Sequence, residues 1–546
     1  MRRHRVAASL AVLLGIASTC AAKPPTITAL FPAGAERGQT VSVKLSGNFD
    51  HWPAKCWLDG EGLTVTPAEE KGVLSIAVAG DALPGVRWFR VFDQDGASSS
   101  RPFVVGVLRE IAEVEPNDDP RKPQKVEEPR VTINGRLAKN GDVDGFAVEL
   151  KAGAVLTADL QAARPIGSPM DGVLQVVSAD GFVMAQNDDD VGMDPRIVFE
   201  APSDGTYIVR LFAFPAAPDS SIRFSGGDAY VYRLTLTTGG FVDHAFPLAV
   251  AAGGPAEVAA VGPNVPAPGP GSALAVPAGD DPGRVALAHP SLPGIAEVRR
   301  VAGPTAVEAE VAADDHPQPL ADLGSVSGRL DLPAERDIYR IALKNGETRV
   351  FRVESREFGL PLDPVVAVLD AEGKALAEAD DRRRSSKDPE LKFAPKADGE
   401  YRVVVRDLHG RGGPRYAYLL SVAKPEPDFE LTLAADQFEV TPGKESKVAV
   451  TIDRREGFAG EIEIRAEGLP AGVEATKVVS KSGDDSAKSV TLEIRAAADS
   501  NAPAGPFRVF GRPVEGDGRD RPARVNLADF GAETEQPWLT VLPAPK

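Results

Sequence analysis

Cysteine is almost absent from this chain of 546 residues, which contains only Cys20 and Cys56. Cys20 lies at the end of an N-terminal segment in which three arginines precede an apolar run over residues 6–16. This pattern predicts a signal peptide over residues 1–22. Its removal leaves Cys56 alone, so an internal disulfide is excluded. The alternative is a lipid-modified Cys20, which is less favoured because Thr19 is larger than the residue usual before such a cysteine.

Long apolar runs and excess basic charge are also missing. No later stretch approaches the roughly 20 apolar residues that a transmembrane helix needs, so the mature chain is expected to be extracellular, at the cell surface or periplasmic, with no transmembrane segment. The net charge is −18. Nucleic acid and anionic membranes require a basic face, and neither is an expected partner.

Histidines are few and scattered, six in all, and none lies at metal-ligand spacing from another. The chain has no His-Glu-x-x-His motif, no Gly-x-Ser-x-Gly elbow and no phosphate-binding P-loop. A catalytic triad assembled from distant loops would also need a domain of catalytic size. The sequence therefore predicts a protein that is not an enzyme.

Glycine and proline are plentiful instead, at 53 and 47 residues, and they are spread along the whole chain. Runs rich in valine and threonine alternate with polar residues, turn residues recur about every ten positions, and helical periodicity is nearly absent. This texture is typical of antiparallel sandwiches. We expect an all-β protein, a string of about five β-sandwich domains of immunoglobulin-like and jelly-roll-like type, with no helical domain.

The chain contains an internal repeat of domain size. Gly135 corresponds to Gly328 at an offset of 193 residues (328 minus 135), and the register then holds to within a residue or two. Further pairs are Asp144 and Asp337, and Tyr207 and Tyr401, and each copy ends in an alternating strand, which contains Tyr232 in the first and Tyr418 in the second. Ahead of them, Phe31-Pro32 recurs more faintly as Phe246-Pro247. The duplicated unit is therefore a pair of domains, A followed by B.

These repeats define five expected modules. They are A1 (23–108), B1 (109–240), A2 (241–322), B2 (323–424) and a C-terminal module C (428–546). A2 is shorter than A1 and rich in proline, alanine and glycine, which leaves open whether it is a folded, degenerate domain or partly disordered.

The B modules resemble the bacterial pre-peptidase C-terminal (PPC) domain, a jelly-roll-like sandwich attached to many secreted proteases and collagenases. In B1 the resemblance rests on Glu113-Val114-Glu115-Pro116-Asn117-Asp118, then Gly141-Asp142-Val143-Asp144-Gly145-Phe146, then Asp204-Gly205-Thr206-Tyr207. The acidic entry segment followed by the Gly-Asp-x-Asp turn makes this match specific.

The A modules look like immunoglobulin-like TIG domains, which open with Phe-Pro followed by glycine and alternating valines. Module C is similar to immunoglobulin-like domains that cap bacterial surface enzymes, with residues 468–473 as its most recognisable turn. The combination resembles exported multidomain proteins of bacteria such as planctomycetes.

A structural calcium ion is expected at the start of B1. Calcium takes six to eight oxygen ligands, and such oxygens come from six residues in two short segments: Glu113, Glu115, Asn117, Asp118, Asp142 and Asp144. The resemblance adds that related collagen-binding domains hold calcium with a linker and an acidic turn of this kind. The alternative is a solvated acidic linker, with Asp144 as a turn cap.

Three other features have plainer interpretations. The leader of B2, read as residues 314–319, lacks the Glu-Pro-Asn-Asp order, so calcium is not expected there. The acidic run at residues 187–190 is interpreted as a hairpin turn ordered by its own side chains. Cys56 is interpreted as buried and inert, and Trp52, beside His51 in an expected loop, is the tryptophan most open to a ligand.

Two functional hypotheses remain. The leading one is a non-catalytic binding or scaffold protein of the cell envelope or exterior, which holds an extracellular polymer (a polysaccharide or a collagen-like protein) or an envelope protein. The alternative is an accessory chain that targets a secreted peptidase or glycan-degrading enzyme to its substrate. A hydrolase ranks third, because no module offers a recognisable catalytic group.

Overall fold

The computed structural model describes residues 23–217, 223–309, 316–382, 386–498, 500, 504–516 and 518–543. The predicted signal peptide over residues 1–22, with Cys20, lies outside them. The described chain consists of β-strands and three short 3-10 turns, η1 (Arg356–Phe358), η2 (Asp485–Ala487) and η3 (Ala528–Phe530). The predicted all-β class is confirmed. None of the described helices is long and apolar enough to cross a membrane.

Module A1 is a sandwich whose strands turn alternate residues toward the core. In β6, Leu74, Ile76 and Val78 are buried while Ser75 is exposed, as the two-residue period of a pleated strand requires. One sheet has the order β1-β3-β6-β5 and the other β2-β9-β7-β4, with β8 pairing β7. The strands are β1 (Thr26–Phe31), β2 (Gly34–Glu36), β3 (Thr40–Asn48), β4 (Lys55–Leu58), β5 (Leu63–Pro67), β6 (Val73–Val78), β7 (Gly85–Asp93), β8 (Gly96–Ala97) and β9 (Arg101–Gly106).

Module B1 has two five-stranded sheets, β10-β12-β19-β14-β17 and β11-β13-β18-β15-β16. Strand β10 pairs in parallel with β12, and β11 pairs in parallel with β13. The connections from β10 to β11 and from β12 to β13 therefore both pass from the first sheet to the second. The strands are β10 (Arg109–Ala112), β11 (Gln124–Val126), β12 (Arg130–Arg136), β13 (Asp144–Leu150), β14 (Val155–Gln161), β15 (Met170–Ser178), β16 (Val183–Asn187), β17 (Arg196–Glu200), β18 (Gly205–Pro215) and β19 (Val231–Thr237).

Module A2 repeats the plan of A1 with fewer strands. Strand β21 pairs in parallel with β25, as β2 does with β9, and the two sheets have the orders β20-β22-β23 and β21-β25-β24. A2 is thus a smaller, folded sandwich. Its strands are β20 (His244–Phe246), β21 (Ala249–Ala251), β22 (Ala256–Val261), β23 (Ala273–Val276), β24 (Gly283–Ala288) and β25 (Ile295–Val301).

Module B2 has the same strand order as B1, in the sheets β26-β28-β35-β30-β33 and β27-β29-β34-β31-β32. Strands β26 and β27 precede residue 323 yet pair with β28 and β29. They are very short and carry no alternating pattern, so the sequence gives little sign of them. The strands are β26 (Thr305–Val307), β27 (Gln318–Pro319), β28 (Ser325–Arg329), β29 (Arg336–Leu343), β30 (Arg349–Glu354), β31 (Pro364–Leu369), β32 (Ala375–Ala379), β33 (Glu390–Phe393), β34 (Gly399–Asp407) and β35 (Ala417–Ala423).

Module C has one large and one small sheet. The large sheet has the order β40-β42-β38-β36-β45-β44-β39-β41 with β46 on β45, and the small one has the order β37-β47-β43. The strands are β36 (Asp428–Leu433), β37 (Gln437–Val440), β38 (Glu445–Arg455), β39 (Ile462–Glu467), β40 (Val473–Ala475), β41 (Val478–Ser480), β42 (Ser489–Ala496), β43 (Gly505–Pro506), β44 (Arg508–Pro513), β45 (Arg521–Leu527), β46 (Ala532–Thr534) and β47 (Trp538–Val541).

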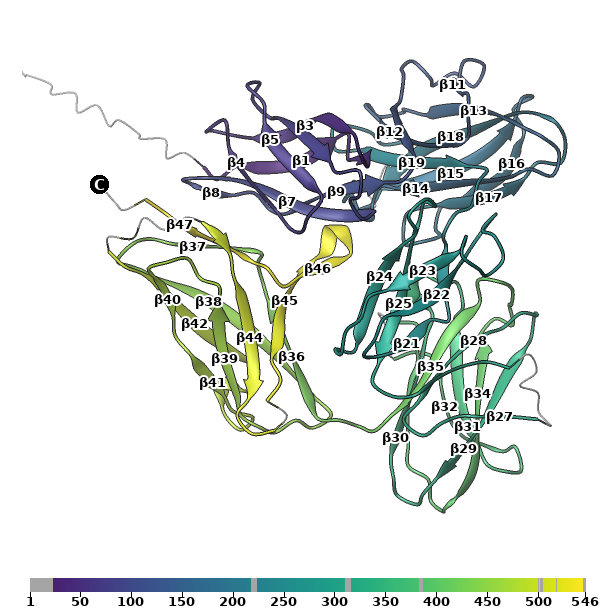
Figure 1. The fold of residues 1–546 in the computed structure, drawn as a ribbon, viewed down its shortest axis with the longest axis vertical. Helices are drawn as coiled ribbons and strands as arrows, with labels where there is room; N and C mark the ends of the chain where they lie inside the picture. The colour runs from purple at the N-terminus through teal and green to yellow at the C-terminus, as the bar shows by residue number, and fades with distance from the viewer. Residues whose placement is uncertain are drawn as a thin grey trace, which may run out of the picture.

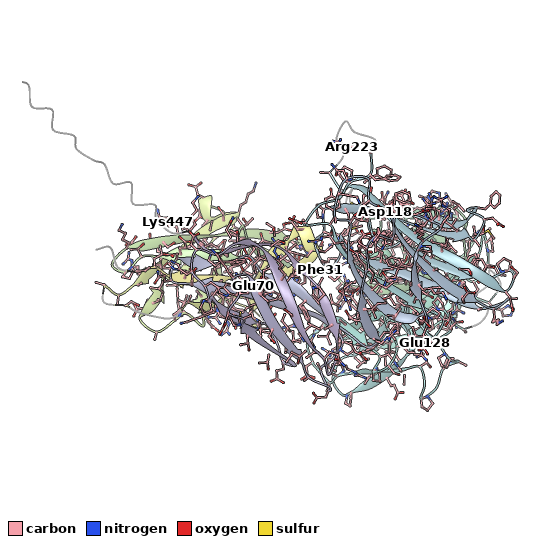
Figure 2. All side chains as sticks on the ribbon, turned by 90° about the horizontal axis from the view of Figure 1, so that it is seen from above. Phe31, Glu70, Asp118, Glu128, Arg223 and Lys447 are labelled. Carbon is pink, nitrogen blue, oxygen red and sulfur yellow. The ribbon has the colours of Figure 1, made fainter. Side chains whose placement is uncertain are left out.

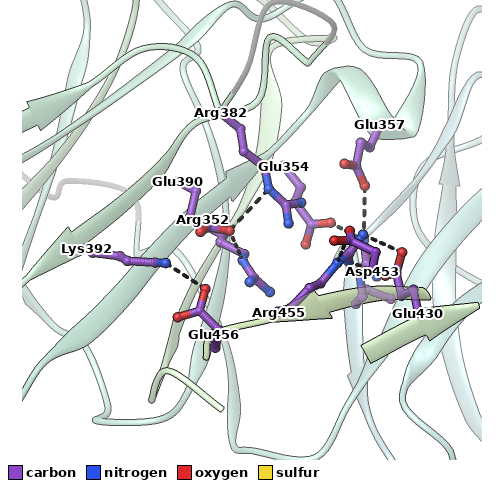
Figure 3. Close-up of polar contacts among 11 residues, drawn as sticks. Arg352, Glu354, Glu357, Arg382, Glu390, Lys392, Glu430, Asp453, Arg455 and Glu456 are labelled. Carbon is purple, nitrogen blue, oxygen red and sulfur yellow. Dashed lines mark hydrogen bonds and ion pairs between the residues drawn. The ribbon is translucent and has the colours of Figure 1, made fainter. Parts of the chain in front are cut away.

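Ion pairs join B1, A2, B2 and C. Arg415 of B2 lies 2.7 Å from Asp190 of B1 and 3.0 Å from Asp243 of A2. At the next boundary Lys392 of B2 lies 2.6 Å from Glu456 of C, as Figure 3 shows. Asp190 and Asp243 are mostly buried, so removing a partner would leave an uncompensated charge.

The chain curves so that C returns to A1, and Figure 1 shows the five modules around a central opening. The fully buried Arg90 of A1 lies 3.3 Å from Asp436 of C. Nearby the rings of Trp57 and Trp538 meet edge to face, with centroids 5.7 Å apart. Residues of all five modules line a cavity of about 1640 Å³ between them.

Candidate metal centre

Two of the sheet-to-sheet connections of B1 bring predicted calcium ligands together. Residues 113–123 connect β10 to β11, and residues 137–143 connect β12 to β13. Strands β10 and β12 are parallel neighbours, so both connections leave the first sheet at the same end of the sandwich. The backbone carbonyl of Asn117 reaches the start of β13, where it lies close to Gly145.

Four of the six predicted ligands form one cluster. Glu115, Asp118, Asp142 and Asp144 each offer a carboxylate oxygen, and these oxygens all lie within 4.8 Å of one another. Asp142 and Asp144 are fully buried, whereas Glu115 and Asp118 are exposed. Asp118, labelled in Figure 2, lies far from Lys447 of module C. The cluster therefore has a buried floor and a side that solvent can reach.

The side chain of Asn117, the fifth predicted ligand, is buried and has no hydrogen-bond partner. Its side chain is 1% exposed, and neither its amide oxygen nor its amide nitrogen has a partner. One oxygen of Asp142 and one of Asp144 are likewise buried without a hydrogen bond. Buried polar atoms in folded proteins almost always have partners, so these atoms are ones that a bound group could satisfy.

Lys139 is the basic group nearest to the cluster. Its Nζ lies 3.3 Å from Asp118 and 3.6 Å from Asp142, and most of its side chain is exposed. The backbone N–H of Ala138 donates to the other oxygen of Asp142, at 2.5 Å. One solvated ammonium can balance at most one of these carboxylates, so the cluster stays acidic.

Glu113, the sixth predicted ligand, is not part of the cluster and contacts it through Tyr232. It accepts hydrogen bonds from the Arg136 N–H and from the hydroxyl of Tyr232, both at 2.8 Å. The same hydroxyl lies 2.5 Å from Asp144, so its single hydrogen is shared between the two carboxyl groups. Burial, and then the charge of Glu113, raise the pKa of Asp144, and burial also raises the pKa of Glu113.

Sequence reasoning missed Tyr232 and Lys139. Tyr232 could have been found, because the closing strands of B1 and B2 share a Tyr-x-Tyr pattern that ends in Tyr232 and Tyr418. Its importance lies in reaching Glu113, 119 residues away in sequence. Lys139 gave no signal, since a lone lysine in a polar loop is unremarkable.

The leader of B2 differs from its sequence-based alignment. The N–H of Arg329 donates to Glu308 at 2.8 Å, as the N–H of Arg136 does to Glu113. Gln318 binds the backbone beside β26 just as Gln124 binds it beside β10. Glu308 therefore takes the place of Glu113, and Asp314 and Asp315 lie outside the described residues.

The other sequence candidates have structural roles. Asp190, in the acidic run, pairs with Arg415 and Arg196. The indole N–H of Trp52 donates to the Ala68 carbonyl at 2.8 Å, and its ring packs on Phe49. Burial raises the pKa of the Cys56 thiol to about 11, which disfavours the reactive thiolate.

Comparisons with known proteins reach only part of the chain. No family model matches it. A probable subtilase-type serine protease of Deinococcus radiodurans is 34% identical over 105 residues, which make up 19% of this chain and 14% of that protease. The chain thus matches about one seventh of its relative's length.

Solved structures give weaker likenesses. The fibronectin(III)-like modules of Clostridium thermocellum CbhA are 12% identical and cover 40% of this chain and 90% of their own, with a TM-score of 0.14. The M60 catalytic domain with the CBM51-1 and CBM51-2 domains of Clostridium perfringens ZmpB is 10% identical, covering 71% and 54%, with a TM-score of 0.12. Scores this low carry no functional argument.

Proposed function

We propose that this chain is an exported, non-catalytic binding or scaffold protein of the cell envelope or exterior, and that a calcium ion orders its first A–B unit. The PPC-like B modules would hold a polysaccharide, a collagen-like protein or an envelope protein. The observation that carries the calcium proposal is the set of orphaned buried atoms on Asn117, Asp142 and Asp144. A bound cation would satisfy their oxygens.

The donor set favours calcium over other metals. The cluster offers carboxylate oxygens from four side chains, and the neighbouring residue Asn117 has a buried amide oxygen without a partner. Zinc and copper sites generally include nitrogen or sulfur ligands, whereas calcium prefers six to eight oxygens in a flexible shell. Calcium would also neutralise charge on Asp142 and Asp144, which cost free energy when buried and ionised.

Calcium binding is tested by isothermal titration calorimetry on the mature chain, residues 23–546. Asp118→Asn removes one exposed ligand charge, and we expect it to weaken binding at least tenfold. Asp119→Asn makes the same change one residue later, where the carboxylate pairs with Arg121 instead, and should bind like the wild type. Equal affinities for all three proteins would contradict the site.

Polymer binding is tested separately by retention on insoluble polysaccharides and collagen, in calcium and in chelator. Retention that calcium supports and Asp118→Asn reduces would favour a binding module ordered by the metal. No retention on any polymer in either buffer would contradict polymer binding and direct the search to envelope proteins.

The second candidate function is an accessory chain of a secreted peptidase. The identity over 105 residues with a subtilase-type protease supports it. Co-purification of a peptidase with the tagged mature chain from its native host would favour this candidate. Hydrolysis by the chain itself would contradict both proposals.

A further inference from the structure

Modules B1 and B2 share the buried support of the metal cluster. In B2 the hydroxyl of Tyr418 donates to Asp337 at 2.6 Å, as Tyr232 donates to Asp144 in B1. Glu308 accepts the Arg329 N–H on the other side of the pair. The duplication has thus kept a carboxyl pair and a tyrosine in matching positions of the two modules.

The part of the site that would face a metal has changed in B2. Glu335 takes the place of Asp142, since it accepts the N–H of Leu332 at 2.6 Å, as Asp142 accepts that of Ala138. Tyr339 replaces Phe146, and its hydroxyl lies 2.6 Å from that of Tyr418. Within the described residues, no B2 side chains form a metal-like cluster.

The orphaned atoms of B1 also have no counterpart in B2. Asp144 keeps a buried oxygen without a hydrogen bond, whereas the described atoms of Asp337 and Glu308 leave none. Asp337 is 2% exposed and bonds to Glu308 as well as to Tyr418, just as Asp144 bonds to Glu113 and Tyr232 in B1. The carboxyl pair is thus common to both modules, and what the described part of B2 lacks is the cluster of further carboxylates beside it.

The charged groups around the B2 pair are acidic. Glu335 and Asp331 face it from the loop before β29, and Tyr339 and Tyr418 face it from β29 and β35. The guanidinium of Arg329, on β28, pairs with Asp331. Asp337 is buried and Glu308 is partly buried, and like charges in contact at such a place favour a proton on one of the two carboxyls.

We propose that a proton shared between Asp337 and Glu308 takes, in B2, the place that calcium takes in B1, so that B2 is stabilised by protonation and is indifferent to calcium. Asp337 holds the proton and donates it to Glu308. The calcium half of this contrast rests on the proposed function, whereas the proton half rests on the B2 geometry alone.

The sign of the pH dependence follows from the proton count. Burial, and then the charge of Glu308, raise the pKa of Asp337 to about 9, above its value in the unfolded chain of about 4. Folded B2 therefore holds one more proton than unfolded B2 between these limits. Stability is greatest below the lower limit and falls as pH rises, by up to about tenfold per pH unit in the opening equilibrium.

Hydrogen exchange of the β28 and β35 amides in the mature chain tests this proposal, at saturating calcium between pH 6 and pH 8.5. After correction for intrinsic exchange, wild-type opening should increase steeply with pH. Asp337→Asn imitates the protonated carboxyl and should flatten this dependence. Glu400→Gln, a matched change at an exposed site on β34, should leave it unchanged.

A second variant covers the case in which Asp337→Asn fails to fold. Glu308→Gln supplies an amide donor in place of the proton, so it should also flatten the pH dependence. Wild-type pH dependence in either folded variant would overturn the proposal. So would a change in β28 and β35 exchange when chelator replaces calcium. Failure of B1 to bind calcium, with the pH result intact, would overturn the proposed function alone.

Discussion

At the scale of single residues, carboxyls buried on their β-strands carry most of the chemistry of this protein. Asp144 and Asp337 begin or nearly begin β13 and β29, where the first residues of a strand enter the sandwich. A lone carboxylate in such a place would destabilise the fold. Each is stabilised by a tyrosine hydroxyl from the last strand of its own module, so the pair survived duplication as a unit.

Cys56 provides a prediction at the same scale. With a pKa of about 11, only about one native molecule in a thousand carries the thiolate at pH 8. The mature chain should therefore react with iodoacetamide roughly two orders of magnitude more slowly when native than when unfolded in urea, where the pKa is about 8.5. The rate is measured by mass spectrometry.

An exposed thiol serves as the control. Asp180→Cys places a second cysteine in the exposed turn before β16, and that thiol should react at nearly the same rate in both states. Equally fast labelling of Cys56 in native and unfolded chains would show that its thiol is not buried.

At the scale of elements, the repeated object is an A–B pair with its contact. The guanidinium of Arg136 lies over the ring of Phe31 at 5.5 Å, and that of Arg329 over Phe246 at 6.0 Å. Arg136 ends β12 and Phe31 ends β1, so the same strand ends meet in both units. The interface was therefore duplicated together with the two folds.

Calcium should act on two connections of B1 and not on their B2 counterpart. When chelator removes calcium, we expect residues 113–118 and 138–142 to exchange amide hydrogens several-fold faster, because the repulsion among four carboxylates returns. Saturation at a hundredfold excess over Kd would stabilise this region by about 2.7 kcal/mol. Hydrogen exchange with mass spectrometry measures the effect.

Residues 330–335 are the internal control, because they connect β28 to β29 as residues 137–143 connect β12 to β13. Their exchange should be the same in calcium and in chelator. Two results would argue against a metal confined to B1. One is faster exchange of these B2 residues in chelator, and the other is unchanged exchange of the two B1 segments in chelator.

At the scale of the whole molecule, module C closes the chain onto A1 and B1. Phe530 of turn η3 is 6% exposed, and its ring meets that of Trp88 with centroids 5.2 Å apart. Gly167 of B1 lies against the same ring, where a Cβ would come within 2.4 Å of it. Phe530 therefore fills a notch that two modules form together.

Removing this ring should open the closed arrangement. Phe530→Ala loses the burial of a large side chain, a change that costs about 3–5 kcal/mol in protein cores, and we expect the radius of gyration from small-angle X-ray scattering to increase. Phe182→Ala removes a ring that is 71% exposed and should leave the scattering unchanged. Identical curves for both variants would show that Phe530 does not hold C in place.

The sequence by itself determined the all-β class, the duplication and four clustered carboxylates, because each is written in local patterns. Alternating apolar residues dictate strands, repeated residues at a fixed offset reveal the copies, and acidic turns mark oxygen ligands. Tertiary structure alone decided that Glu113 supports Asp144 through Tyr232, that Glu308 starts the B2 leader, and that C closes onto A1. These contacts join residues far apart in sequence, so they depend on how whole sheets pack, which no local pattern encodes.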